Sequence, residues 1–156
     1  MIETGQTAPD FTLPRDGGET LTLSAQKPQK VVLYFYPKDD TPGCTKEAIG
    51  FSEHLDAFTA AGATVIGVSK DSVKKHDKFR DKHSLTVALV SDEEGTVCED
   101  WGTWVEKKMY GKTYMGIERS TILIDGTGRI ARIWRKVKVN GHVDEVLVAA
   151  RDLTAK

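Results

Sequence analysis

The sequence predicts a mixed α/β fold, with a central sheet flanked by helices on both faces. Two continuous apolar runs, at residues 31–36 and 64–69, have the composition of strands that are buried on both faces. A stretch with helical spacing of apolar side chains follows each run, so strand and helix alternate as in α/β domains. Short alternating segments before the first run add an N-terminal β-hairpin.

The first half of the chain supplies most of these signals. Residues 10–23 alternate apolar and polar around the turn sequence Pro14-Arg-Asp-Gly-Gly18, which predicts the hairpin. Residues 31–36 form the expected central strand, which Pro37 ends. A helix is expected from Pro42 until Gly62 stops it, because apolar residues recur at helical spacing, namely Ala48, Phe51, Leu55 and Phe58.

The second half continues the alternation and closes the sheet. After the strand at 64–69, the patterns predict a charged helix at 73–83, a strand at 87–90, a short helix at 94–101, a hairpin formed by 120–125 and 129–134, and a closing helix at 141–153. In open α/β sheets, sites lie at the carboxyl ends of the strands. The loop after residue 36 is therefore the expected position of a site.

Composition limits the classes of function. A chain of 156 residues, 39% of them hydrophobic, fits one domain over residues 1–156. With no leader pattern and no apolar run of roughly 20 residues, we expect a cytoplasmic protein without a membrane segment. The scattered histidines and two distant cysteines predict no metal or other cofactor. A net charge of −1 argues against nucleic acid, and the basic stretch at 129–138 is interpreted as a solvated strand edge.

Cys44 is the residue with the clearest chemical signal. It follows a polar, turn-rich loop and falls in the first turn of the expected helix, where unpaired N–H groups and the helix dipole favour a thiolate. The alternative is a small buried hydrophobic residue, which is what most isolated cysteines are. Because Cys44 comes directly after a surface loop, we favour a reactive thiol.

The stretch around Cys44 resembles a known family, the peroxiredoxins. Pro37, Thr41 and Cys44 match the family's Pro-x3-Thr-x2-Cys signature, and the segment from Tyr36 to Glu47 is similar to the peroxiredoxin Q branch, also called bacterioferritin comigratory proteins. The similarity extends along nearly the whole chain. It implies a thioredoxin-like fold and a thiol-dependent peroxidase that reduces hydrogen peroxide and organic hydroperoxides through a cysteine sulfenic acid.

The resemblance also assigns roles to residues. Cys44 corresponds to the peroxidatic cysteine, Thr41 and Pro37 to its loop partners, and Arg119 to the active-site arginine. Arg119 has a rigid fork of donors that can serve both thiolate and peroxide. Glu47, one turn beyond Cys44, is expected to orient Arg119. Each residue also has a structural interpretation: Arg119 anchors its loop, Thr41 caps the helix, and Glu47 complements the helix dipole.

The sequence departs from the branch where a resolving cysteine is expected. The position five residues after Cys44 is Ile49, and Arg80 stands near the other usual position. Cys98 remains, and we interpret it as a packed thiol, with a resolving role as the alternative. The expected mechanism is therefore one-cysteine, with an external thiol such as thioredoxin, glutaredoxin or glutathione as reductant, in a monomer or a weak dimer.

Two other functions compete with this one. A thiol-disulfide oxidoreductase of thioredoxin type needs a second cysteine in the motif, but Thr41 stands at that position, and no proline follows Cys44. A binding module with an inert cysteine is the second competitor. Several aromatic and methionine residues could line a hydroperoxide pocket, but we favour core packing for Trp101, Trp104, Met109, Tyr110, Tyr114 and Met115.

Overall fold

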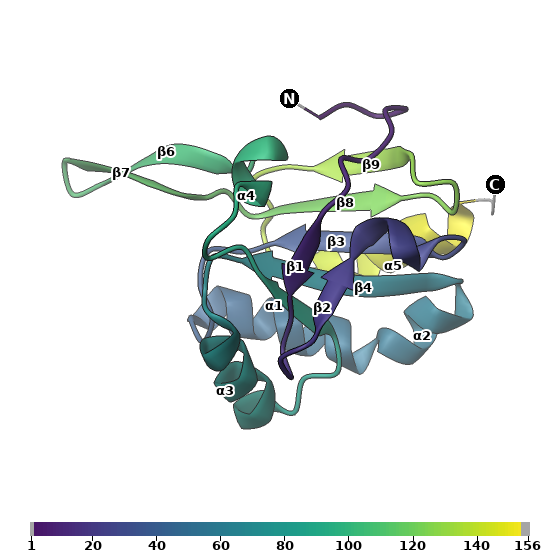
Figure 1. The fold of residues 1–156 in the computed structure, drawn as a ribbon, viewed down its shortest axis with the longest axis horizontal. Coiled ribbons are helices and arrows are strands. Elements are labelled where there is room, and N and C mark those ends of the chain that lie inside the picture. Colours follow the sequence, from purple (N-terminus) through teal and green to yellow (C-terminus); the bar gives the residue numbers. More distant parts are fainter. Residues whose placement is uncertain (1, 154–156) are drawn as a thin grey trace.

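A five-stranded mixed sheet forms the centre of the molecule (Figure 1). A computed structural model describes residues 2–153. The strand order is β5 (Ala88–Ser91), β4 (Ala63–Ser69), β3 (Lys30–Phe35), β8 (Ser120–Ile124), β9 (Ile130–Trp134). Strands β3, β4 and β5 are parallel, whereas β8 and β9 run antiparallel to their neighbours. The predicted mixed sheet is confirmed, and β3 is its central strand.

The pairing of β3 with β8 brings two distant segments to one end of the sheet. All six residues of β3 are buried, as expected for a strand covered on both faces. In the antiparallel register, Phe35 lies opposite Ser120. The loop that follows β3 therefore starts beside the residue that precedes β8, which is Arg119.

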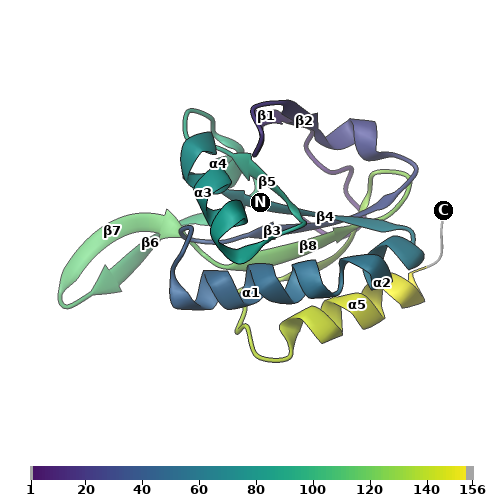
Figure 2. The same ribbon diagram turned by 90° about the horizontal axis from the view of Figure 1, so that it is seen from below.

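Helices α1 (Pro42–Glu53), α2 (Leu55–Ala60) and α5 (His142–Asp152) lie along one face of the sheet (Figure 2). They share a core cluster with inward-facing residues of the strands, and α3 (Val73–His83) adds Phe79 to the same cluster. The opposite face is covered by the N-terminal hairpin of β1 (Thr12–Pro14) and β2 (Thr20–Thr22), the 3-10 helix η1 (Leu23–Gln26) and α4 (Val97–Asp100). Helices and the predicted N-terminal hairpin thus account for both faces.

One predicted helix is two helices in the structure. The spacing predicted a single helix from Pro42 to Gly62, but it breaks at His54, where ψ is 7°. The His54 ring nitrogen Nδ1 lies 2.9 Å from the Gly50 carbonyl oxygen, which also accepts the His54 backbone N–H. A side chain that shares an i−4 carbonyl in this way competes with the helical pattern. The apolar spacing continues through the break, so the sequence pattern did not reveal it.

The hairpin of β6 (Trp104–Met109) and β7 (Lys112–Ile117) projects from the body and was not predicted (Figure 1). Tyr110 and Gly111 form its two-residue turn, both with positive φ, a conformation that suits tight hairpins. Packing was the wrong expectation for four residues of this hairpin, because their side chains are 44–97% exposed: Met109, Tyr110, Tyr114 and Met115. Trp101 is buried as expected.

The interpretation of the basic stretch at 129–138 as a strand edge is confirmed for its first half only, because the strand ends at Trp134. Strand β9 is an edge strand of the sheet. Arg132 lies on it and pairs with the exposed Glu145 of α5 at 3.3 Å. No helix in residues 2–153 has the length and hydropathy needed to cross a membrane.

Candidate active site

Cys44 lies in the first turn of α1, at the end of the loop that follows β3. Thr41 has extended backbone angles at the N-cap position, and Pro42 is the first helical residue. The Thr41 carbonyl accepts the first helical hydrogen bond, from the Thr45 N–H at 2.8 Å. The thiol is 1% exposed and faces the core cluster that α1 shares with the sheet. The predicted placement of Cys44 at a helix start is confirmed.

Arg119 reaches Cys44 from the segment between β7 and β8. Its Nη2 donates to Cys44 Sγ at 3.2 Å, and its Nη1 donates to Glu47 Oε1 at 2.6 Å. One guanidinium thus contacts the sulfur and the carboxylate together, as its fork of donors allows. The structure brings together the three residues that the sequence analysis connected, although 75 positions separate Cys44 from Arg119.

Glu47 is completely buried one turn along α1. Its second oxygen, Oε2, has no hydrogen-bond partner among the described residues. Burial raises the pKa of Glu47 to about 7, although the charge and hydrogen bond of Arg119 oppose this rise. Burial also lowers the pKa of Arg119, but the negative charges of Glu47 and Cys44 outweigh it and raise that pKa overall. Arg119 therefore remains a cation beside the sulfur.

Gly43 makes this approach possible, and the sequence analysis did not single it out. A Cβ atom at residue 43 would lie 3.2 Å from Arg119 Nη2, closer than most Cβ contacts. The only signal in the sequence is its position between Pro42 and Cys44 in the family-like stretch. Absence of a side chain here lets the guanidinium lie against the first turn of α1.

Thr41 and Pro37 occupy the loop, but among residues 2–153 the Cys44 sulfur has its side-chain hydrogen bond from Arg119 and none from these two residues. The Thr41 hydroxyl donates to the Lys38 carbonyl oxygen at 2.9 Å and makes no capping bond to the helix. Capping is therefore not what its side chain does in this structure. The donated proton fixes the hydroxyl orientation and leaves its oxygen lone pairs free to accept. Pro37 is exposed where the loop begins.

Cys98 lies in a different environment from Cys44. It is fully buried in α4, in the core cluster on the opposite face of the sheet from the Cys44 cluster. Burial raises the pKa of the Cys98 thiol far above its ordinary value, and the nearby carboxylate of Asp92 adds to this effect. Both cysteines are free thiols. Within residues 2–153, no His, Cys, Asp and Glu side chains cluster in a way that could hold a metal ion.

Comparison with known proteins establishes the family. The AhpC/TSA family profile matches residues 4–133. The chain belongs to the AhpC/TSA family. It is 57% identical over 146 residues to the putative peroxiredoxin bcp of Coxiella burnetii, covering 94% of this chain and 97% of the relative. It is 52% identical over 155 residues to peroxiredoxin Bcp of Bacillus subtilis, covering 99% of each chain.

A solved structure agrees with these relatives. The bacterioferritin comigratory protein of Xanthomonas campestris, studied for alkyl peroxide reduction, superposes with a TM-score of 0.86 at 47% identity, covering 90% of each chain. The thioredoxin-like fold and the peroxiredoxin Q resemblance are confirmed. This AhpC/TSA member is an enzyme, a thiol-dependent peroxidase whose family implies a hydroperoxide substrate and a thiol reductant.

Proposed function

We propose that Cys44 is the peroxidatic cysteine of this peroxidase and reacts as a thiolate held by Arg119. The observation that supports this most strongly is the fork of Arg119, which joins Cys44 Sγ at 3.2 Å and Glu47 Oε1 at 2.6 Å. A fixed cation favours the charged form of the sulfur. A thiolate at this position has the nucleophile and its charge partner already in place before peroxide enters.

The reaction proceeds by displacement at oxygen. The Cys44 sulfur attacks one peroxide oxygen, a sulfur–oxygen bond forms, and the O–O bond breaks. The departing oxygen carries the electron pair and takes a proton, leaving as water or as an alcohol. Donors placed where this negative charge develops lower the barrier. Arg119 supplies such donors, the Thr41 hydroxyl accepts from the peroxide, and Pro37 limits water access without presenting an N–H.

Hydrogen peroxide and organic hydroperoxides are the proposed substrates. The attack uses only the O–O bond, so the group on the leaving oxygen can vary. Study of alkyl peroxide reduction in the Xanthomonas campestris relative supports the organic class.

The proposed cycle uses one cysteine and an external thiol. Ile49 and Arg80 occupy the positions where a resolving cysteine was sought, and Cys98 is buried on the other face of the sheet. An external thiol, from thioredoxin, glutaredoxin or glutathione, then attacks the sulfenic sulfur, forms a mixed disulfide with Cys44 and releases water. A second external thiol attacks the mixed disulfide, so that Cys44 returns to the thiol and the two external sulfurs leave as a disulfide. This cycle takes place in one domain that acts in the cytoplasm as a monomer or a weak dimer.

Mass spectrometry after one equivalent of peroxide, without reductant, tests this proposal. Trapping with dimedone is expected to label Cys44 in the parent protein and equally in Cys98→Ser, whereas Cys44→Ser is expected to lose label and peroxidase activity together. A Cys44–Cys98 disulfide as the main product would replace the one-cysteine cycle with a two-cysteine one. Undiminished peroxide consumption by Cys44→Ser would remove Cys44 from the mechanism altogether.

A further inference from the structure

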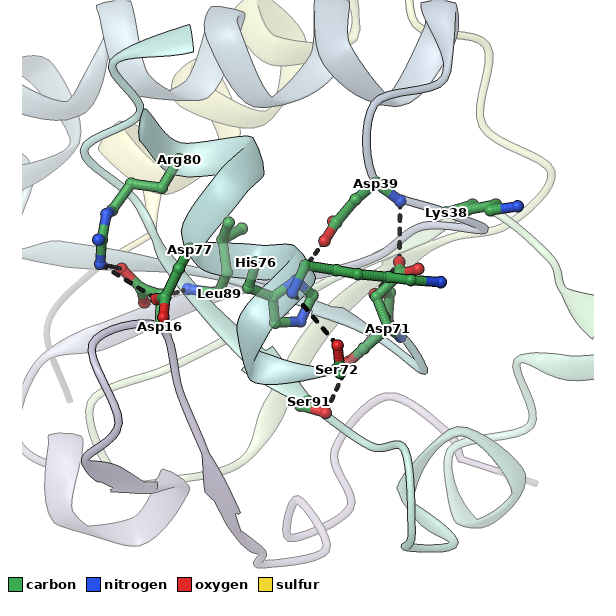
Figure 3. Close-up of polar contacts among 12 residues, drawn as sticks. Asp16, Lys38, Asp39, Asp71, Ser72, His76, Asp77, Arg80, Leu89 and Ser91 are labelled. Carbon is green, nitrogen blue, oxygen red and sulfur yellow. Dashed lines mark hydrogen bonds and ion pairs between the residues drawn. The ribbon is translucent and has the colours of Figure 1, made fainter. Parts of the chain in front are cut away.

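A buried polar network lies behind the loop that carries Cys44. His76 of α3 is fully buried, and its Nδ1 lies 2.6 Å from Asp39 Oδ2 (Figure 3). The other Asp39 oxygen accepts from the Tyr36 hydroxyl at 2.6 Å. The Asp39 backbone N–H donates to Asp71 Oδ2 at 2.8 Å, and Ser69 donates to the same Asp71 oxygen at 2.7 Å. Nothing in the peroxide chemistry described above uses this network.

His76 is held in its doubly protonated form by its two partners. Its Nδ1 faces the carboxylate of Asp39, and its Nε2 faces the Val90 carbonyl oxygen at 2.9 Å. Neither partner has a proton to donate, so both ring nitrogens must carry one for both hydrogen bonds to form. His76 is therefore an imidazolium, and it forms a buried ion pair with Asp39.

The charged groups around His76 agree with this assignment. The loop contributes Asp39, the segment after β4 contributes Asp71, and β3 leads to the Tyr36 hydroxyl, 3.5 Å from Nδ1. Positive charge near His76 would disfavour its protonated form. It comes from four lysines that line a surface pocket of about 340 Å³ together with Asp39 and Asp71, namely Lys38, Lys75, Lys78 and Lys82. Burial lowers the pKa of His76, but Asp39 and its hydrogen bonds outweigh burial and raise that pKa overall.

The ion pair fixes a loop whose backbone is strained. Asp39 lies five residues before Cys44, and the next residue, Asp40, has φ of 61°, which is rare for residues with a side chain. Asp40 is itself tied to α3, by Lys82 at 2.8 Å and His83 at 2.9 Å, but these contacts are exposed. The contact to His76 is buried, so solvent screens it less than it screens the two exposed contacts of Asp40.

We propose that His76 is a positioning residue for Cys44: its imidazolium holds Asp39 and thereby controls how often the loop at residues 37–44 opens. The proposal rests on the role assigned to Cys44 above. Because Cys44 is 1% exposed, a bulky thiol reaches its oxidised form only when this segment moves. The closed loop favours reaction with peroxide, and the open loop favours reduction, so the network sets the balance between the two steps.

The proposal predicts a pH dependence with a definite sign. In the open loop, His76 loses Asp39 and returns toward its ordinary pKa of 6.5, whereas in the closed loop its pKa is higher. The extra stability of the closed loop is fully present below pH 6.5 and is lost as the pH rises through the raised value. Opening is therefore expected to become more frequent in alkaline solution.

Hydrogen exchange of the amides at residues 37–45, followed by mass spectrometry and corrected for intrinsic exchange rates, measures this opening directly. In His76→Phe the Asp39 carboxylate loses its cation, and we expect exchange at least tenfold faster than in the parent, with a slower peroxide reaction. In His76→Asn the amide nitrogen can replace the Nδ1 donor, so we expect partial rescue without the pH dependence. Val146→Ala in α5 is the matched control, because Val146 belongs to the buried cluster that includes Phe79 of α3 but lies outside residues 37–45.

Two outcomes would overturn the proposal. In the first, the loop amides of His76→Phe exchange no faster than those of Val146→Ala after each rate is corrected for the free energy of unfolding of that variant. In the second, an alkaline rise in exchange persists unchanged in His76→Asn. Exchange is measured without peroxide, so these outcomes are independent of whether Cys44→Ser loses activity, and failure of the positioning role is distinguishable from failure of the proposed chemistry.

Discussion

At the scale of single residues, a substitution of Gly43 is expected to lower the activity while the stability changes little. Its neighbour across the first turn of α1 is Arg119 Nη2, 3.2 Å from where a Cβ would lie. For Gly43→Ala we expect a change in unfolding free energy within about 1 kcal/mol, because alanine suits a helix better than glycine. We expect the second-order rate constant with hydrogen peroxide to fall by about tenfold, because the guanidinium is pushed from the sulfur.

Gly50→Ala in the same helix is the matched control for that measurement. Its Cβ would lie 3.0 Å from Val143 Cγ2, so the crowding falls on the core and not on Arg119. Denaturant unfolding and stopped-flow peroxide kinetics on both variants separate the two effects. Equal losses of rate in Gly43→Ala and Gly50→Ala would show that helix packing, and not the position of the guanidinium, controls the reaction.

Arg119 provides a second prediction at this scale. Lysine keeps the charge but is a point donor on a flexible stem, so it cannot contact Cys44 Sγ and Glu47 Oε1 together. For Arg119→Lys we expect the peroxide rate constant to fall on the order of a hundredfold with the fold retained. Arg132→Lys, at an exposed pair with Glu145, is expected to leave the rate unchanged. Stopped-flow kinetics and circular dichroism check both variants.

At the scale of elements, α1 and α3 both have a hydroxyl residue at the N-cap position, but only in α3 does its side chain cap the helix. Ser72 caps α3 by accepting from the Lys75 N–H at 3.2 Å, whereas Thr41 at the same position of α1 makes no capping bond. We expect Ser72→Ala to cost about 1 kcal/mol of unfolding free energy and Thr41→Ala to cost less. Peroxide kinetics should show the reverse order, with Thr41→Ala the slower enzyme. A larger stability loss in Thr41→Ala would return Thr41 to a capping role.

The periodic pattern of apolar residues predicted most helices and strands, because an element that is buried must place apolar side chains on its buried face. The pattern failed for elements that are mostly exposed. The strands at 30–35, 63–69 and 120–124 are buried runs, and all were predicted. The β6–β7 hairpin is mostly exposed, so its residues carry no strong alternation, and its Tyr110-Gly111 turn is not the Asn-Gly or Asp-Gly pair that marks such turns. The break at His54 depends on one side-chain hydrogen bond within a continuous apolar stripe.

At the scale of the whole molecule, the site joins segments that no local pattern connects. Cys44 and Glu47 were predictable from the start of one helix, but Arg119 reaches them only because β3 pairs with β8. The resemblance to peroxiredoxins, not spacing, supplied Arg119. His76 and Asp39 were missed for the same reason, since a histidine inside a charged helix gives no sign of being buried against a loop 37 positions away.

The pH dependence of global stability gives the last prediction, because two buried groups act in opposite directions. Glu47 has its pKa raised from 4.5 to about 7 by burial, so between these values only the folded state keeps the proton, and stability falls as pH rises. His142 has its pKa lowered from 6.5 to about 4 by burial, so between these values only the unfolded state is protonated, and stability rises with pH. His142 Nε2 lies 2.8 Å from Thr121 Oγ1.

Single variants should therefore reveal slopes of opposite sign between pH 4.5 and 6.5. Glu47→Gln removes the falling contribution, so its unfolding free energy should rise with pH more steeply than that of the parent, by at most about 1.4 kcal/mol per pH unit. His142→Gln, whose amide can still pair with Thr121, should show the reverse change. Urea unfolding across this pH range measures both slopes, and the double variant should restore a slope close to that of the parent. Parallel pH profiles for the two single variants would show that burial does not shift these groups in opposite directions.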